Sequence, residues 1–69
     1  VIKNDCFIAP GVSIAGRVSI ENGSFVGIGC SIKDKIKIGA NTVIGAGSVV
    51  INDFPPNTKA AGVPARQLN

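Results

Sequence analysis

The sequence predicts an all-β chain that folds as a three-sided parallel β-helix of about three coils. Three observations predict this fold class: every sixth residue is aliphatic, a second column of mostly small residues has the same period, and β-branched residues dominate the composition. Ten isoleucines and eight valines stand against a single leucine, Leu68, among 69 residues. Because β-branched side chains favour strands over helices, a helical bundle is excluded.

The aliphatic column is the strongest signal in the chain, and it continues without a break to Val50. A period of six fits neither an α-helix nor one long strand, but it is typical of parallel β-helices in which a turn follows each short strand. Three hexads make a coil of 18 residues, so residues 18 apart should stack about 4.8 Å from one another. The nine members of the column are Ile2, Ile8, Ile14, Ile20, Val26, Ile32, Ile38, Ile44 and Val50.

A second inward column lies four residues after each aliphatic position. Seven of its nine members are Ser, Thr, Cys or Val, and Phe54 closes it. Cys6 and Cys30 belong to this column on different faces of the prism, so we interpret both as small buried residues rather than as a disulfide or a zinc site. Glycine or alanine follows the aliphatic residue in five hexads, where we expect a tight turn or a positive φ. These five residues are Ala9, Ala15, Gly27, Gly39 and Gly45.

The regular pattern ends near Asn52. Pro55 and Pro56 have no N–H to donate to a sheet, and two in succession indicate an exit from it. We therefore expect the β-helix to occupy residues 1–55 and an irregular tail, packed along the prism, to occupy residues 56–69. Phe54 is expected to plug the last coil in the place of a small inward residue.

Composition excludes several classes of function. The net charge of +3 is diffuse, and its one cluster, Lys33, Lys35 and Lys37, has no interleaved aromatic residue, so nucleic-acid binding is not expected. We interpret this cluster as a solvated face. No apolar run reaches the roughly 18 residues that span a membrane. With no histidine and only two cysteines, the chain offers no metal site, and a reducing, cytoplasmic setting is expected.

Two stretches carry a resemblance to a known family. IGAGSVV at residues 44–50 is followed by NDFPPNTKAAGVPAR at 52–66, and APGVSIAG at 9–16 is followed by FVGIG at 25–29. They resemble the C-terminal part of hexapeptide-repeat acyltransferases, and their order is most similar to the sialic acid O-acetyltransferase and bacillosamine N-acetyltransferase group. The resemblance covers about residues 6–67. It implies a left-handed β-helix, a hand that periodicity does not give, since crossovers between parallel strands are normally right-handed.

The resemblance also implies an activity: transfer of an acetyl group from acetyl-CoA, without a metal, to an amino or hydroxyl group of a sugar or nucleotide-sugar. The resemblance further implies a homotrimer of parallel prisms, with CoA in the groove between neighbouring prisms. A histidine serves enzymes of this family as general base. By similarity this histidine would fall just before Val1, and a second family histidine would fall at Phe7. We therefore assign no catalytic residue within the chain, and expect it to begin inside a longer enzyme.

Several residues are candidates for contact with acetyl-CoA. Gly16 is a candidate by similarity to the family's AG pair. Ile28 lies between two glycines and outside the inward columns, which is unusual for a solvated face and indicates groove lining. Gly45, Ala46 and Gly47 leave bare backbone that pantetheine amides could reach. Because these residues lie on different hexads, we expect a groove between two prisms to gather them.

Basic residues of the tail are candidates for the CoA phosphates. Lys59 and Arg66 are assigned this role by similarity to family tails of the form AGxPA followed by Lys or Arg, which this chain has as AGVPAR at residues 61–66. The lysines at 33, 35 and 37 are the alternative counter-charge. A non-catalytic structural module is the alternative function, and it would bind no CoA even in the complete protein.

Overall fold

The chain forms the predicted three-sided parallel β-helix, seen in a computed structural model that describes residues 1–68. Each hexad contributes one two-residue strand, whose first residue points outward and whose second is the inward aliphatic residue. Residues 1–68 contain no helix. The strands of the repeat are β1 (Phe7–Ile8), β2 (Ser13–Ile14), β3 (Ser19–Ile20), β4 (Phe25–Val26), β5 (Ser31–Ile32), β6 (Lys37–Ile38), β7 (Val43–Ile44) and β8 (Val49–Val50).

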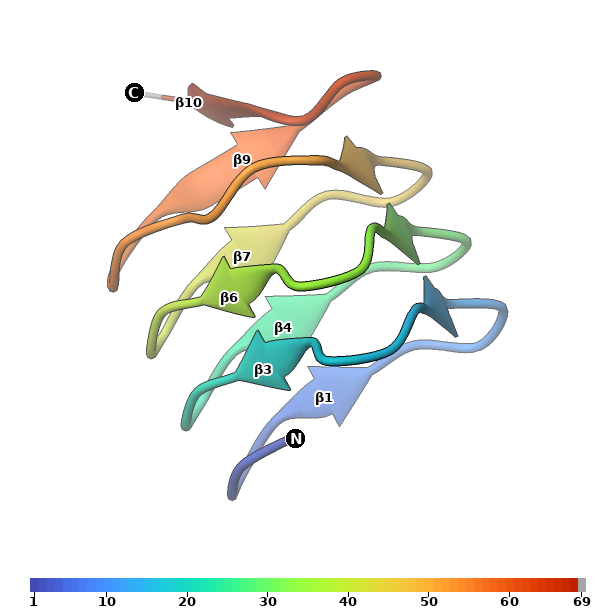
Figure 1. Ribbon diagram of the computed structural model, residues 1–69. Coiled ribbons are helices and arrows are strands. Elements are labelled where there is room, and N and C mark those ends of the chain that lie inside the picture. The colour runs from blue at the N-terminus through green and yellow to red at the C-terminus, as the bar shows by residue number, and fades with distance from the viewer. Residues whose placement is uncertain (69) are drawn as a thin grey trace.

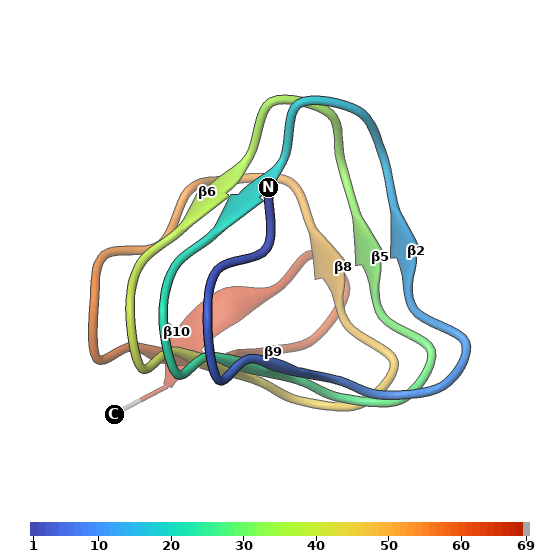
Figure 2. The same ribbon diagram turned by 90° about the horizontal axis from the view of Figure 1, so that it is seen from below.

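The strands stack into three parallel sheets, one on each side of the triangular outline (Figures 1 and 2). The stacking of residues 18 apart is confirmed on every side: Ile8 pairs with Val26 and Val26 with Ile44, for example. Members of the aliphatic column from Ile20 onward are at most 3% exposed, whereas Ile2 at the N-terminal end of the prism is 49% exposed. The column is therefore the core of the protein.

The small inward column makes hydrogen bonds as well as filling space. Ser24 Oγ donates to the carbonyl oxygen of Gly39 at 2.9 Å, and Cys30 Sγ is 3.0 Å from that of Gly45. In both pairs the acceptor follows the donor by 15 residues and belongs to the next coil. Both cysteines are free thiols, and Cys30 is buried while Cys6 is half-buried. The small residues thus satisfy carbonyl groups at the corners, which burial would otherwise leave unpaired.

Positive φ falls in a different column from the one expected. It does not occur at the glycine or alanine that follows each aliphatic residue. These glycines instead allow close approach between coils: a Cβ on Gly39 would lie 2.3 Å from the backbone nitrogen of Pro56. The chain turns two residues later, at every sixth residue in succession. The residues with positive φ in this series are Asp5, Gly11, Arg17, Gly23, Gly29, Lys35, Asn41 and Gly47.

The third coil is two residues shorter than the others. Ile38 pairs with Phe54 and Val43 with Lys59, which are 16 rather than 18 positions apart. Figure 2 shows the last coil, in orange, passing inside the corner that the earlier coils reach. Phe54 is buried and closes the core, as expected, but the column assigned to it is wrong. The shortening places Phe54 above Ile38 in the aliphatic column.

Residues 56–69, expected to form an irregular tail, contain two further strands in their described part. β9 (Lys59–Ala61) adds a parallel strand to β7, and β10 (Arg66–Leu68) pairs antiparallel with β9. The interpretation of Pro55 and Pro56 as an exit from the sheet is wrong, because both lie in the corner between Phe54 and β9. Their missing N–H groups cost little there, since no strand of residues 1–68 pairs beyond Phe54 on this side.

Asp53 compensates for the shortened corner. In a full-length coil the first strand residue donates its N–H to a backbone carbonyl, as Ser19 does to Ile36 at 2.9 Å. The N–H of Lys37 donates instead to Asp53 Oδ1 at 2.8 Å. A side-chain acceptor has therefore replaced a backbone acceptor where the chain omits two residues.

We predict that Asp53→Ala lowers the free energy of unfolding by about 1 kcal/mol, because the Lys37 N–H loses its acceptor. Asp53→Asn retains an acceptor oxygen at the same position and should recover most of the loss. Urea unfolding of the two variants beside the parent protein measures the difference. Equal stability of the alanine variant and the parent would contradict this role of Asp53.

We also predict that Gly39→Ala destabilises the protein by roughly 1–3 kcal/mol, because the added methyl group collides with the rigid backbone of the next coil. Gly16→Ala is the matched control. A Cβ at Gly16 would meet only Asp34 Oδ1, at 3.6 Å, and its φ is not positive. The control should therefore keep or slightly raise the thermal midpoint. If Gly39→Ala had the same thermal midpoint as the parent protein, the two coils would be able to move apart at this point and the prediction would be wrong.

Candidate functional site

The prism has three corners, and their side chains differ. The glycine corner comprises residues 9–12, 27–30 and 45–48, between the sheets of β1 and β2. The basic corner comprises residues 15–18 and 33–36, and the proline corner comprises residues 21–24, 39–42 and 55–58. The fold thus fixes which parts of the repeat share one edge of the molecule.

The glycine corner gathers most of the predicted site residues. Ile28, Gly45, Ala46 and Gly47 all lie on it, and Gly47 N–H donates to the carbonyl oxygen of Ile28 at 2.8 Å. Four of the five residues for which a groove between two prisms was expected therefore already lie on one corner of a single prism, and Gly16 is the exception. The reason is the coil length: positions 28 and 46 are 18 apart and occupy the same place in successive coils.

The surface of this corner is apolar and consists largely of bare backbone. Ile28 is 63% exposed, and Ala46 and Gly47 are exposed beside it. Within residues 1–68 the N–H groups of Ile28 and Ala46 donate to no acceptor. Two free amide donors therefore lie one coil apart, about 4.8 Å along the prism, next to an exposed aliphatic side chain. This combination suits a linear ligand that carries amide carbonyls on an aliphatic chain.

The other two corners lack this combination. At the basic corner Arg17 Nη2 contacts Asp34 Oδ2 at 2.6 Å, and at the proline corner Asn22 Oδ1 accepts the N–H of Asn4 at 3.0 Å. The corresponding N–H groups there, of Gly16, Asn22, Asp34 and Ala40, also have no acceptor among residues 1–68, so the glycine corner differs from the other two in its exposed Ile28 side chain and not in its free N–H groups. Gly16 belongs to the basic corner, beside Asp34 and away from Ile28 along the coil. Its contact with a coenzyme stays a prediction, one that requires a neighbouring prism.

The two basic candidates lie beyond the glycine corner, on the last two strands. Lys59 opens β9 and Arg66 opens β10, and both side chains are exposed. Arg66 pairs across the strands with Ala61, the last residue of β9. A Cβ added to Gly45 would lie 3.0 Å from the Ala61 methyl group, so Arg66 lies on the strand next to the one that borders the glycine corner. Neither Lys59 nor Arg66 forms an ion pair with another described residue.

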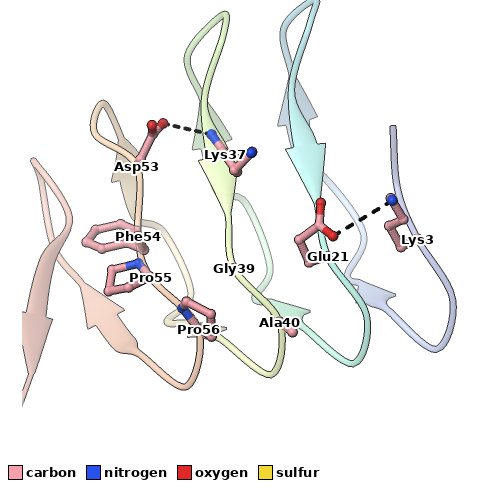
Figure 3. A pocket seen from close by; sticks show the side chains of 9 residues that line it. All are labelled: Lys3, Glu21, Lys37, Gly39, Ala40, Asp53, Phe54, Pro55 and Pro56. Atoms are coloured by element: carbon pink, nitrogen blue, oxygen red, sulfur yellow. Dashed lines mark hydrogen bonds and ion pairs between the residues drawn. The ribbon is translucent and has the colours of Figure 1, made fainter.

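An open groove of about 720 Å³ lies elsewhere, on the outer face of β3 and β6 and the proline corner. Figure 3 shows two polar contacts there: Lys3 Nζ is 3.8 Å from Glu21 Oε1, and Asp53 Oδ1 accepts the backbone N–H of Lys37. None of the seven predicted site residues lines it. Its lining residues are Lys3, Glu21, Lys37, Gly39, Ala40, Asp53, Phe54, Pro55 and Pro56.

The glycine corner exposes no acid or base, and the one titratable side chain among its residues, Cys30, is buried. Glu21 and Asp34 are engaged in ion pairs, Asp53 accepts a backbone hydrogen bond, and all three lie outside this corner. In the described part of the chain no three His, Cys, Asp or Glu side chains are grouped as they would be around a metal ion. Residues 1–68 also contain no helix of the length and apolarity needed to cross a membrane. The corner therefore exposes backbone and apolar groups but no side chain that could transfer a proton.

Sequence reasoning missed one feature of the surface, an exposed aromatic pair. Phe7 and Phe25 occupy the outward positions of β1 and β4, with ring centroids 5.0 Å apart and ring planes at 15°. The signal was available, because the two residues are 18 apart. It was overlooked because the outward positions of the repeat were treated as merely polar.

Comparison with known proteins identifies the repeat. The profile of the bacterial transferase hexapeptide family (six repeats) matches residues 17–52. No curated protein matches the chain by sequence.

Solved structures of high similarity are acetyltransferases. Perosamine N-acetyltransferase from Caulobacter crescentus, a variant with CoA and GDP-perosamine bound, superposes with a TM-score of 0.97 at 37% identity over 99% of this chain. Galactoside acetyltransferase in complex with coenzyme A gives 0.94 at 34% identity over 99%. The acetyltransferase domain of PglB from Neisseria gonorrhoeae, in complex with acetyl coenzyme A, gives 0.90 at 32% identity over 91%. These superpositions confirm the left-handed parallel β-helix.

The chain spans less than half of each of these relatives. The superposed part amounts to 32% of the perosamine enzyme, 43% of the galactoside enzyme and 31% of the PglB domain. The similarity therefore concerns the β-helical coils and the strands that close them.

Proposed function

The chain belongs to the bacterial transferase hexapeptide family, and from this premise we propose that it is the coenzyme-binding part of an acetyltransferase. The reaction is transfer of the acetyl group from acetyl-CoA to an amino or hydroxyl group of a sugar or nucleotide-sugar. The observation that carries the proposal is the glycine corner, where two free amide donors flank an exposed aliphatic side chain. Three of the similar structures bear CoA or acetyl-CoA, and one also bears GDP-perosamine.

The glycine corner is suited to the pantetheine arm of the coenzyme. That arm is an aliphatic chain with two amide groups, so its carbonyls can accept from the N–H groups of Ile28 and Ala46. The Ile28 side chain would cover its methylene groups, and Gly45 and Gly47 leave room for the close approach. In the proposed complex Lys59 and Arg66 bind the phosphates, because both are exposed cations on the strands that follow this corner.

The chemistry is a nucleophilic acyl transfer. The acceptor nitrogen or oxygen forms a bond to the thioester carbonyl carbon, a base removes its proton, and the carbon–sulfur bond breaks to release CoA as the thiol. The chain has no histidine, and its described carboxylates lie away from the glycine corner. We therefore place the general base outside these 69 residues, as the histidine expected just upstream of Val1.

We further propose a homotrimer of parallel prisms in the cytoplasm. Exposed apolar residues such as Ile28 and Val63, which is 74% exposed, supply contact surface. Gly16 would then meet the coenzyme held on a neighbouring glycine corner. Two free thiols are compatible with a reducing compartment.

We predict that Ile28→Ser weakens acetyl-CoA binding about tenfold, because the coenzyme loses an apolar contact. Ile51→Ser is the matched control: Ile51 is also exposed, at 42%, but it follows β8 and lies outside the glycine corner. Calorimetric titration of both variants with acetyl-CoA compares them. No acetyl-CoA binding by the folded parent protein would reject the enzyme and favour a structural module.

A second prediction concerns the phosphates. The double variant Lys59→Ala with Arg66→Ala should bind CoA roughly tenfold more weakly and with less dependence on salt, since two charge-assisted contacts are lost. Its affinity for S-acetylpantetheine, which lacks the nucleotide, should be unchanged. Replacement of Lys33 and Lys35 by alanine is the control, and a larger loss in that control would move the phosphate site to the basic corner.

A further inference from the structure

The outward positions of the three sheets differ in chemistry. On the sheet of β2, β5 and β8 they are Ser13, Ser31 and Val49, and on the sheet of β3 and β6 they are Ser19 and Lys37. On the sheet of β1, β4, β7 and β9 they form a different row, which we call the aromatic row. Its members, in register, are Phe7, Phe25, Val43 and Lys59.

The side chains of the aromatic row before Lys59 are apolar and are nevertheless exposed to solvent. Phe7 is 53% exposed, Phe25 42% and Val43 41%. The two rings stack along the row with centroids 5.0 Å apart and planes at 15°. A cross-strand aromatic pair stabilises a sheet by only about 0.5–1.5 kcal/mol, which does not by itself explain two half-exposed phenylalanines on a small prism.

The geometry of the row leaves a place for a third ring. Because Phe7 covers one face of the Phe25 ring, the other face is turned toward the next strand, where the smaller Val43 stands. Gly27 and Gly45, which follow these strands, lie close to the backbone of Ala46 and the methyl group of Ala61 and leave no free space, so the room for a ring comes from the smaller size of Val43 alone. A planar group could therefore stack on Phe25 one strand spacing farther along, at about 4.8 Å.

Charge at the end of the row indicates what that planar group carries. Lys59 is the next member after Val43, and Arg66 lies on the adjoining strand β10. Of the four acids in the chain, Glu21, Asp34 and Asp53 are engaged on other faces. The fourth, Asp5, precedes Phe7 at the opposite end of the row. The end beyond Val43 is therefore electropositive.

From these observations we infer that the aromatic row binds a nucleoside diphosphate, with the base stacked on Phe25 above Val43 and the phosphates at Lys59. Two strand spacings, about 10 Å, separate Phe25 from Lys59, and a base and its diphosphate span a similar length. Stacking on an aromatic side chain tolerates any base, so the row selects for a nucleotide rather than for one nucleobase.

This inference rests on the proposed transferase for its ligand, because acetyl-CoA and a nucleotide-sugar acceptor both contain a nucleoside diphosphate. Lys59 binds the phosphates of the coenzyme in the first case and those of the acceptor in the second, in which Arg66 is left for the coenzyme. Ile28 lies three residues after Phe25, so the glycine corner and the aromatic row are neighbours on one side of the prism. A nucleotide on the row would bring whatever is attached to its phosphates close to the acetyl group.

The test uses Phe25→Ser and Val43→Phe. The first removes the stacking surface, and the second fills the place of the base with a third ring while extending the aromatic stack. Both should weaken nucleotide binding at least about tenfold, as expected for loss of base stacking. Phe25→Trp should retain binding. Val49→Phe, on the outward position of β8 in the same coil, is the matched control and should change nothing.

Calorimetric titrations with GDP, UDP, CoA and S-acetylpantetheine distinguish the two sources. Weaker binding of GDP or UDP in both variants identifies the acceptor as the source of the nucleotide. Weaker binding of CoA alone, with no binding of free GDP or UDP, identifies the coenzyme. S-Acetylpantetheine should bind all variants equally, and its failure to bind the parent would count against the proposed transferase rather than against the aromatic row.

Two outcomes would overturn the inference. One is unchanged affinity for GDP, UDP and CoA in both variants. The other is a change in sedimentation mass on Phe25→Ser or Val43→Phe with nucleotide affinity following the mass, which would make the row a contact with a second copy of the chain.

Discussion

The ladder of inward aliphatic residues is the constraint on which the rest of this structure depends. Each coil must return to the same side of the prism one strand spacing higher, so that Ile20, Ile38 and their neighbours stack in register and stay buried. A coil of 18 residues does this with three equal sides. Everything outside the ladder is then aligned as well, because a residue that is repeated every 18 positions recurs at the same place on the surface. Surface function is therefore arranged in columns that run along the prism.

The aliphatic period made most of the fold predictable, and the failures have one physical source. A periodic pattern predicts the coils that follow it, but it gives no information about a coil of a different length. The last coil omits two residues, so Phe54 moved from the expected small column to the column of Ile38. The same change kept β9 in register with β7, although two prolines precede it. Asp53 shows how such a shortening is tolerated, since its carboxylate takes the hydrogen bond that the missing backbone would have accepted.

The candidate site was predictable in its residues but not in its geometry. Ile28 and Ala46 were singled out for separate reasons, an exposed isoleucine and a bare backbone, although their spacing of 18 places them in one column. The free N–H groups recur in the other corners, at Gly16, Asn22, Asp34 and Ala40, so it is the exposed Ile28 side chain that sets this corner apart. Phe25 was overlooked for the opposite reason: its spacing from Phe7 was visible, but outward positions were assumed to be solvated.

The division of labour along the chain follows from the chemistry that a β-helix can offer. Its inward positions are sterically restricted, and its corners expose backbone, so the coils present amide groups and flat side chains at regular intervals rather than clusters of acids and bases. In the proposed complexes, residues 1–68 would supply N–H donors at Ile28 and Ala46, a stacking surface at Phe25 and cations on the last two strands, and the proton acceptor would lie elsewhere. A surface of this kind can hold two substrates at fixed spacing along one axis. In the proposed transferase the general base is a side chain from outside these residues, so its position relative to the glycine corner would set the rate of the reaction.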